Sequence, residues 1–125
     1  MPRFGRVLVV LAGALILMMG LHSAAAIKRE NALPLWLAEL LQGFESQAAT
    51  NPPPFIAQYN YKGQVVYYVP PRCCDIPSIL YEADGTIICH PDGGAMGRGD
   101  ARCGDFFTER TNERIVWKDP RLRSP

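Results

Sequence analysis

The four cysteines of this chain constrain its fold more than any other feature of the sequence. They are Cys73, Cys74, Cys89 and Cys103. In a small exported chain, an even number of cysteines is typical of a disulfide framework, whereas cytosolic cysteines favour metal or redox sites. No pair has the C-x-x-C spacing of a zinc or redox motif. The first question is therefore whether the chain is exported.

The first 26 residues have the order of a secretory signal peptide. Arg3 and Arg6 supply a positive start, residues 7–21 are apolar apart from glycines, and small residues end at Ala26. A helix of about 15 residues spans roughly 22 Å, which is short of the roughly 30 Å hydrocarbon core of a bilayer. We therefore expect cleavage after Ala26, a mature chain that begins at Ile27, and no transmembrane segment in that mature form.

Residues 27–125 have a length that suits one small disulfide-bonded domain. Two of the 13 basic residues lie in the signal and all 12 acidic residues follow it, so the mature formal charge is −1. A chain without a basic excess predicts neither nucleic acid nor an anionic membrane as a partner. Abundant proline, glycine and tyrosine fit short strands that are joined by many turns.

Apolar residues recur at spacings of three and four between Ala32 and Phe44, which predicts an amphipathic helix with one face on a sheet. Pro34 fits the first turn of that helix. The segment 51–54, Asn-Pro-Pro-Pro, ends it. The apolar positions are Leu33, Trp36, Leu37, Leu40, Leu41 and Phe44.

Two pairs of β-prone segments predict two hairpins. The first pair, 55–60 and 64–69, is expected to be joined by a three-residue loop with a bulge at Gly63. The second pair, 78–82 and 86–89, flanks a turn in which Gly85 takes a positive φ. A short helix from Asp105 and a last strand at 115–117 follow, and we expect the tail from Asp119 to Pro125 to be frayed.

The segment from His90 to Asp105 predicts a long loop, because it holds five glycines and almost nothing apolar. Asp92, Asp100 and Asp105 put carboxylates on this backbone, and oxygen-rich flexible loops suit Ca²⁺. We expect the three aspartates to lie on one exposed face, where their main role is to cap turns. Any Ca²⁺ binding there is expected to have a dissociation constant in the millimolar range at best. No other cofactor is expected.

His90 is the single histidine that follows the predicted signal. One histidine cannot build a metal site of nitrogen ligands, and no serine of the mature chain stands in a nucleophile-elbow context. We therefore expect an exposed loop histidine and no enzymatic activity.

The four cysteines permit three pairings. A bond between Cys73 and Cys74 would close a strained ring, because neighbouring side chains of an extended backbone point to opposite faces. We therefore predict that each of these two cysteines bonds to one of Cys89 and Cys103, in an order that the sequence leaves open. Two such bridges would supply much of the stability of so small a domain.

Residues 59–105 form a distinctive run as a whole. It reads Tyr-x-Tyr-Lys-Gly, Val-Tyr-Tyr-Val-Pro-Pro, Cys-Cys-Asp, Asp-Gly, Ile-Cys-x-Pro-Asp-Gly-Gly, Gly-Asp and Cys. It resembles a family of small exported bacterial domains of unknown function, with a likeness that extends to Trp117. The resemblance implies a periplasmic or extracellular location. Ala101 is a departure, because it stands where the family pattern has the second glycine of Gly-Asp-Gly.

These patterns predict an α+β domain with an N-terminal amphipathic helix packed on a small antiparallel sheet of two hairpins plus a C-terminal strand, stapled by two disulfides. The function we expect is a non-catalytic binding or interaction domain of the bacterial cell envelope, with an unknown protein or envelope component as partner. A protease-inhibitor-like module with an exposed loop and a weak calcium-binding module are the alternatives.

Overall fold

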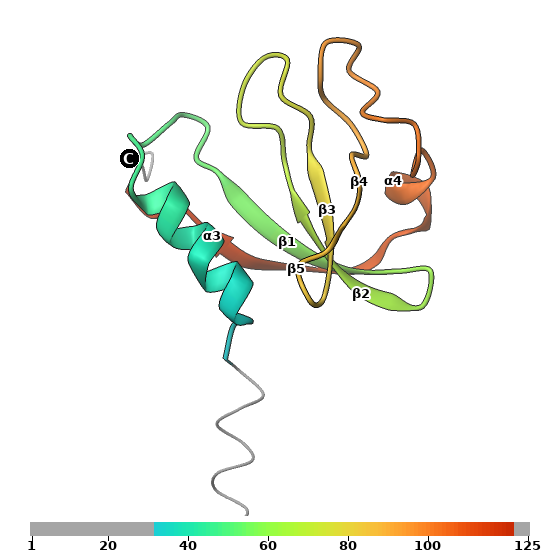
Figure 1. Ribbon diagram of the computed structural model, residues 1–125, viewed down its shortest axis with the longest axis horizontal. Helices are drawn as coiled ribbons and strands as arrows, with labels where there is room; N and C mark the ends of the chain where they lie inside the picture. The colour runs from blue at the N-terminus through green and yellow to red at the C-terminus, as the bar shows by residue number, and fades with distance from the viewer. Residues whose placement is uncertain (1–31, 122–125) are drawn as a thin grey trace, which may run out of the picture. The chain divides into compact units, whose positions relative to one another are not determined.

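The computed structural model describes residues 32–121, so the predicted signal peptide and its cleavage site lie outside the described residues. An antiparallel sheet of five strands and one long helix agree with the predicted α+β class (Figure 1). Among the described helices, none is long and apolar enough to cross a membrane. The elements are α3 (Leu35–Glu45), β1 (Phe55–Tyr61), β2 (Gln64–Val69), β3 (Ile79–Glu82), β4 (Ile87–Cys89), α4 (Phe106–Glu109) and β5 (Thr111–Lys118).

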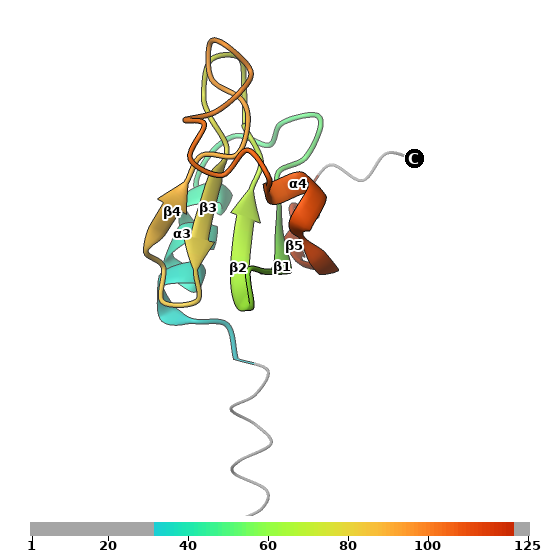
Figure 2. The same ribbon diagram turned by 90° about the vertical axis from the view of Figure 1, so that its right-hand side faces the viewer.

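The sheet has the strand order β4-β3-β2-β1-β5, and all neighbouring strands are antiparallel (Figure 2). Both predicted hairpins are present, as β1-β2 and β3-β4. The last strand is longer than the predicted 115–117, because it pairs with β1 from Thr111 to Lys118. This pairing places the C-terminal strand at one edge of the sheet and β4 at the other.

The turn of the first hairpin differs from the prediction. Tyr61 pairs with Gln64, so only Lys62 and Gly63 form the loop, and no bulge follows. Both residues have positive φ, 49° and 78°, which is the backbone of a type I′ turn. Such a turn has the twist of the strands that it joins, and Lys62 therefore adopts the left-handed region although it has a side chain.

The helix α3 covers one face of the sheet. It begins at Leu35, after Pro34, rather than at Ala32. Its buried side chains, Leu37, Leu41 and Phe44, form a core cluster with residues that alternate along β1 and β2. The sheet residues of this cluster are Ile56, Tyr67 and Val69.

Trp36 joins α3 to the second hairpin. Its ring lies 5.4 Å from that of Tyr67 and 5.0 Å from that of Tyr81, and its indole N–H donates to the carbonyl of Ala83 over 3.0 Å. Gly85 has the positive φ that was predicted, 91°. A Cβ at this position would lie 2.7 Å from Cγ of Trp36, so the glycine also permits the helix to approach.

The other face of the sheet is covered by α4 and by the glycine-rich loop before it. Phe106 of α4 is fully buried there, together with Tyr59, Tyr61 and Tyr68. Cys89 and Cys103 belong to the same cluster. The sheet therefore separates two cores, one under α3 and one under α4 and the loop.

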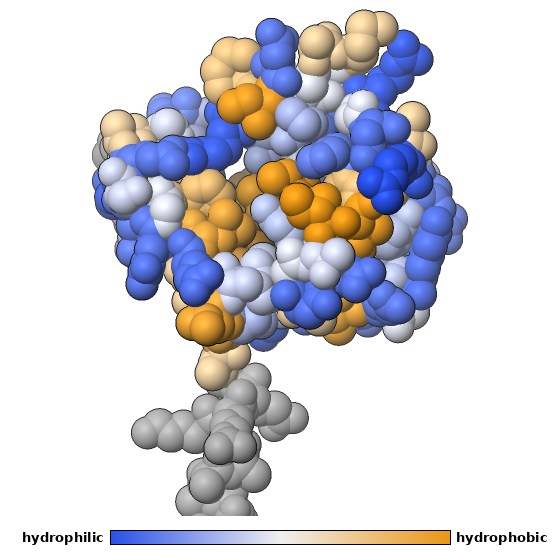
Figure 3. Space-filling view, in the orientation of Figure 1, coloured by the Kyte–Doolittle hydropathy of each residue, from blue (hydrophilic) through white to orange (hydrophobic). Residues whose placement is uncertain are grey.

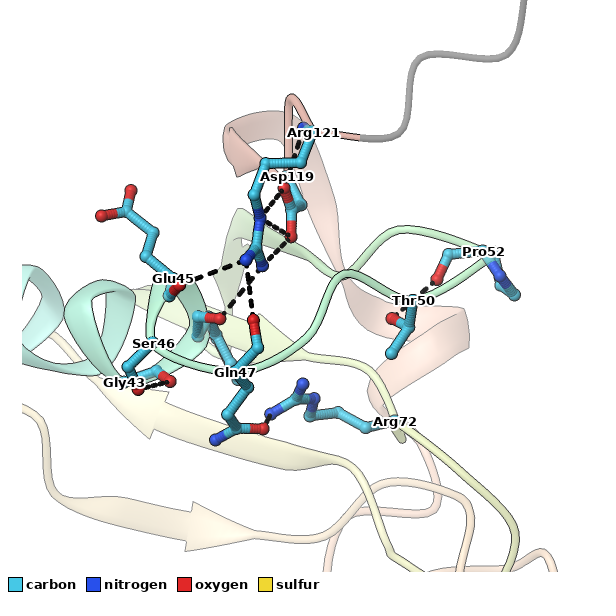
Figure 4. Close-up of polar contacts among 10 residues, drawn as sticks. Gly43, Glu45, Ser46, Gln47, Thr50, Pro52, Arg72, Asp119 and Arg121 are labelled. Carbon is cyan, nitrogen blue, oxygen red and sulfur yellow. Dashed lines mark hydrogen bonds and ion pairs between the residues drawn. The ribbon is translucent and has the colours of Figure 1, made fainter.

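Asp119 and Arg121, after β5, make specific contacts with the domain, so the predicted fraying is wrong for residues 119–121. Asp119 is 3% exposed, and its backbone N–H donates to the carbonyl of Pro54 over 2.9 Å. The Arg121 guanidinium pairs with the Asp119 carboxylate at 2.6 Å. It also donates to the carbonyls of Phe44 and Glu45, in the last turn of α3, and to the carbonyl of Gln47, just after the helix (Figure 4). Carbonyls at a helix end lack partners within the helix, so this arginine caps α3.

We expect Asp119→Asn to lower the Tm at pH 7 by several degrees. The hydrogen bond from Arg121 holds the pKa of Asp119 below its usual range. A carboxyl whose pKa is lower in the folded than in the unfolded state stabilises the fold at any pH above its unfolded pKa, which is about 3.9. This stabilisation is lost as the pH falls through the pKa of the folded state. Thermal denaturation should therefore show a Tm difference at pH 7 that shrinks below pH 4.

Asp75→Asn is the matched control for this experiment, since Asp75 lies in an exposed loop. It removes the same formal charge and should leave the Tm nearly unchanged. A Tm difference for Asp119→Asn that persists undiminished in acid would contradict the role of the Asp119 to Arg121 pair.

Ala101 has a φ of 61°, so the backbone at this position is left-handed although the residue is not the glycine of the family pattern. Hydrogen bonds of the two neighbouring residues fix this conformation. The Asp100 N–H donates to the His90 carbonyl, and the Arg102 N–H donates to the Asp100 carboxylate, each over 3.0 Å. A Cβ in the left-handed region collides with the following carbonyl, at a cost of about 1–2 kcal/mol.

We expect Ala101→Gly to raise the free energy of unfolding by about 0.5–1 kcal/mol, because the relief of the left-handed strain exceeds the greater unfolded-state entropy of glycine. Urea denaturation measures this gain. Ala95→Gly in the same loop is the control, since Ala95 has no positive φ and should lose a little stability. Equal effects of the two substitutions would contradict the strain at Ala101.

Candidate functional site

The three aspartates of the glycine-rich loop are half-buried, whereas the prediction had them exposed, and each has a different hydrogen-bond partner. The Asp92 carboxylate accepts from the Tyr68 hydroxyl over 2.9 Å. Asp105 accepts from the Tyr61 hydroxyl over 2.6 Å and pairs with Lys62 at 2.8 Å. Asp100 accepts from the backbone of its own turn. Within residues 32–121 no group of three or more His, Cys, Asp or Glu side chains could hold a metal ion.

Three tyrosine hydroxyls of the sheet are thus tied to carboxylates that come from later in the chain. The third is Tyr59, which donates to Glu113 and lies under the Arg110 guanidinium, 4.6 Å from its ring. Burial and the hydrogen bond to Glu113 raise the pKa of Tyr59 to about 12. Burial also raises the pKa values of Tyr61 and Tyr68. These hydroxyls stay protonated near neutral pH, so they act as hydrogen-bond donors that tie the glycine-rich loop, the start of α4 and β5 to the sheet.

His90 is half-buried, so the prediction of an exposed histidine is wrong. Its Nδ1 lies 2.7 Å from the carbonyl oxygen of Ser78. The Ser78 hydroxyl bonds instead to the backbone of Asp92, donating to its carbonyl and accepting from its N–H. The histidine and this serine therefore do not form a base and nucleophile pair, and both tie the glycine-rich loop to the start of β3.

The cysteines pair differently from the prediction. Cys73 is bonded to Cys74, and Cys89 to Cys103. The predicted pairing assumed an extended backbone, whereas Cys74 has a φ of 51° and the Ile76 N–H donates to the Cys73 carbonyl in a turn. In a turn, neighbouring side chains need not point to opposite faces. Cys89 at the end of β4 instead meets Cys103 before α4, with 6.2 Å between their Cα atoms.

The loop that Cys89 and Cys103 enclose is curled rather than extended. The Gly97 N–H donates to the Gly94 carbonyl and the Gly99 N–H to the Gly93 carbonyl, each over 3.0 Å. Met96 is 74% exposed at the tip of this curl. A protease cleft binds extended backbone, so the geometry of this loop does not favour the inhibitor-like alternative.

A pocket of about 100 Å³ lies beside the start of β1 and the end of β2. Five of the residues that line it are prolines, and each ring restricts φ, so these walls are stiff. Arg72 is also among the lining residues, and its guanidinium lies 4.8 Å from the centroid of the Phe44 ring and is hydrogen-bonded to the Gln47 side chain (Figure 4). The lining residues are Thr50, Pro52, Pro53, Pro54, Phe55, Val69, Pro70, Pro71 and Arg72.

Other apolar side chains are distributed over the surface. The exposed ones belong to separate elements, such as Leu35 of α3, Ile87 of β4 and Ile115 of β5. On the face drawn in Figure 3, hydrophobic residues lie in a hollow in the middle of the domain, and hydrophilic residues surround it. The proline-lined pocket differs from these single exposed side chains, because apolar residues and Arg72 line one cavity. The pocket was not predicted from the sequence, where the proline runs 52–54 and 70–71 are its one visible signal.

Neither a curated protein nor a solved structure matches this chain. A family model matches residues 42–119, from the last turn of α3 to the buried Asp119. The match includes all five strands, both cysteine pairs and the whole lining of the proline pocket. The chain therefore belongs to the family described as a domain of unknown function, DUF6970.

Proposed function

We propose that this chain is an exported, non-catalytic binding domain of the bacterial cell envelope, and that the proline-lined pocket holds a side chain of a partner polypeptide. The signal-like order of residues 1–26 supports the export, to the periplasm or the cell exterior. The pocket is the single observation that carries the binding role, because its lining combines apolar residues with one arginine.

The size of the pocket selects the group that enters it. A volume of about 100 Å³ is smaller than the roughly 150 Å³ cavity that admits benzene, so an aliphatic side chain such as leucine or valine fits better than an aromatic ring. A buried side chain in a tight pocket is the usual anchor of a protein interface. Stiff proline walls also reduce the entropy that is lost on binding.

Arg72 determines which charged group of the partner can lie next to the bound side chain. Its side-chain hydrogen bond to Gln47 uses one of the five N–H donors of a guanidinium, and stacking on Phe44 holds the group in place. An arginine in the lining of an apolar pocket favours a ligand that carries a carboxylate. The occupant that we propose is therefore an aliphatic side chain with a carboxylate next to it.

A titration followed by ¹H–¹⁵N NMR tests this proposal with two probes, N-acetyl-leucine and its neutral amide, N-acetyl-leucinamide. We expect both probes to shift amide signals of residues 50–55 and 69–72. The acid should bind about fivefold more tightly, because a partly exposed ion pair contributes up to about 1 kcal/mol. Shifts that lie elsewhere, or none at tens of millimolar probe, would overturn the pocket as the binding site.

Arg72→Gln is expected to abolish the preference for the acid and to leave the weaker binding of the amide. Arg98→Gln, in the exposed glycine-rich loop, removes the same charge far along the chain and should keep the preference. A preference that survives Arg72→Gln would refute the role of Arg72.

Export is tested separately. The full chain is expressed in a bacterium and the intact mass of the protein is measured. We expect the mass of a mature chain that starts at Ile27.

A further inference from the structure

We propose that the bridge between Cys73 and Cys74 is a thiol–disulfide exchange site whose substrates are dithiols, and that the bridge between Cys89 and Cys103 is structural. The proposal does not depend on the proline pocket or on its ligand. It rests on the different surroundings of the two bridges, on the loop that carries the first one, and on the backbone of Cys74.

The two bridges differ in access. Cys73 and Cys74 are both exposed, in the loop between β2 and β3. Cys89 and Cys103 are 1% and 3% exposed and lie in the core under α4. Exchange requires a thiolate to reach a sulfur atom, so access limits its rate. A reductant in solution can reach the first bridge in the folded protein, whereas the second must first be uncovered.

The loop of residues 70–78 is held by contacts other than the first bridge. Pro70, Pro71 and Pro77 restrict its backbone at both ends. The Ser78 N–H donates to the Asp92 carbonyl over 2.9 Å, and Pro77 forms a β-bridge with Gly93. The bridge itself joins neighbours, with a sequence separation of 1, so opening it frees almost no chain. Reduction is therefore compatible with the native fold, as a reversible exchange site requires.

The backbone of Cys74 couples the redox state to the shape of the loop. Its φ of 51° is a conformation that residues with a side chain rarely adopt. The bond to Cys73 restrains this backbone. After reduction Cys74 can return to a negative φ, so the oxidised and reduced loops are expected to differ between residues 72 and 76.

The exchange itself proceeds in two balanced steps. A thiolate of the dithiol attacks Sγ of one cysteine, a mixed disulfide forms, the Cys73 to Cys74 bond breaks, and the other cysteine leaves as a thiolate that is protonated. The second thiolate of the dithiol then attacks the dithiol sulfur of the mixed disulfide. An intramolecular disulfide forms in the dithiol, and the second cysteine leaves as a thiolate that is protonated. The dithiol loses two electrons and two protons, and Cys73 and Cys74 gain them as two thiols.

The test is native-state reduction of the oxidised full-length chain by dithiothreitol, with N-ethylmaleimide trapping and peptide mass mapping over time. We expect Cys73 and Cys74 to be labelled at least about 100-fold faster than Cys89 and Cys103, since buried groups react only through opening of the core. The near-UV circular dichroism should stay native during the fast phase. NMR shifts should be confined to residues 70–78, and oxidised glutathione should restore the bridge.

Equal labelling rates for the two bridges, or labelling of Cys73 and Cys74 only when the native circular dichroism is lost, would overturn the proposal. So would a fast phase that oxidised glutathione cannot reverse. The variant Cys73→Ser with Cys74→Ser should lose the fast phase alone. The labelling rates of the wild-type protein decide the outcome. No variant that lacks the bridge between Cys89 and Cys103 is therefore needed.

Discussion

Replacement of Phe106 by alanine is expected to lower the free energy of unfolding by about 3–5 kcal/mol, the largest effect that we predict for one side chain. Phe106 is 0% exposed, and its ring centroid lies 5.4 to 5.6 Å from those of Tyr59, Tyr61 and Tyr68. The hydroxyls of these tyrosines are bound to carboxylates, so the rings cannot move freely into the space that alanine would leave. Urea denaturation at neutral pH measures the loss.

Phe107→Ala is the matched control, because it removes the same atoms from the neighbouring position. Phe107 is 41% exposed, although its ring also contacts Phe106 and Tyr68. We expect this variant to lose about 1 kcal/mol, as substitutions outside a core typically do. Similar losses at the two positions would show that Phe106 is not the centre of this core.

The double substitution Cys89→Ala with Cys103→Ala is expected to cost about 3 kcal/mol, because a bridge with a sequence separation of 14 restrains the unfolded chain by about that amount. The bridge also closes the glycine-rich loop next to α4. Thermal and urea denaturation of the variant and of the oxidised wild type measure the difference.

The double substitution Cys73→Ser with Cys74→Ser distinguishes the possible pairings. In the observed pairing it removes only the bridge between neighbours, so it should cost well under half as much as the loss of the other bridge. In the pairing predicted from the sequence, either double substitution would remove both bridges. Equal losses for the two variants would therefore contradict the observed pairing.

Turn positions and the strands beside them could be predicted from local patterns. Pairs of β-prone segments separated by turns with Gly63 and Gly85 indicated two hairpins, and both glycines have the positive φ of a turn. The number of residues in the first turn could not be predicted, because Lys62 adopts a left-handed backbone that its residue type does not indicate. Strand pairing across the turn selects that conformation.

The cysteine pairing and the roles of the three aspartates required the fold. The predicted pairing required an extended backbone at Cys73 and Cys74, whereas Cys74 has a φ of 51°. Asp92 and Asp105 looked available for a cation, but the sheet places Tyr68 and Tyr61 beside them. A residue's nearest partner in space can lie dozens of positions away, and composition does not reveal it.

The sequence by itself determined the family, the α+β class and the positions of the two hairpin turns, because residue types and their order along the chain carry each of them. Only the tertiary structure decided that Arg121 caps α3, that Cys89 meets Cys103, and that two proline runs form one pocket. These features join segments that are far apart in the chain. Their geometry follows from how the sheet and α3 pack, which short-range patterns do not specify.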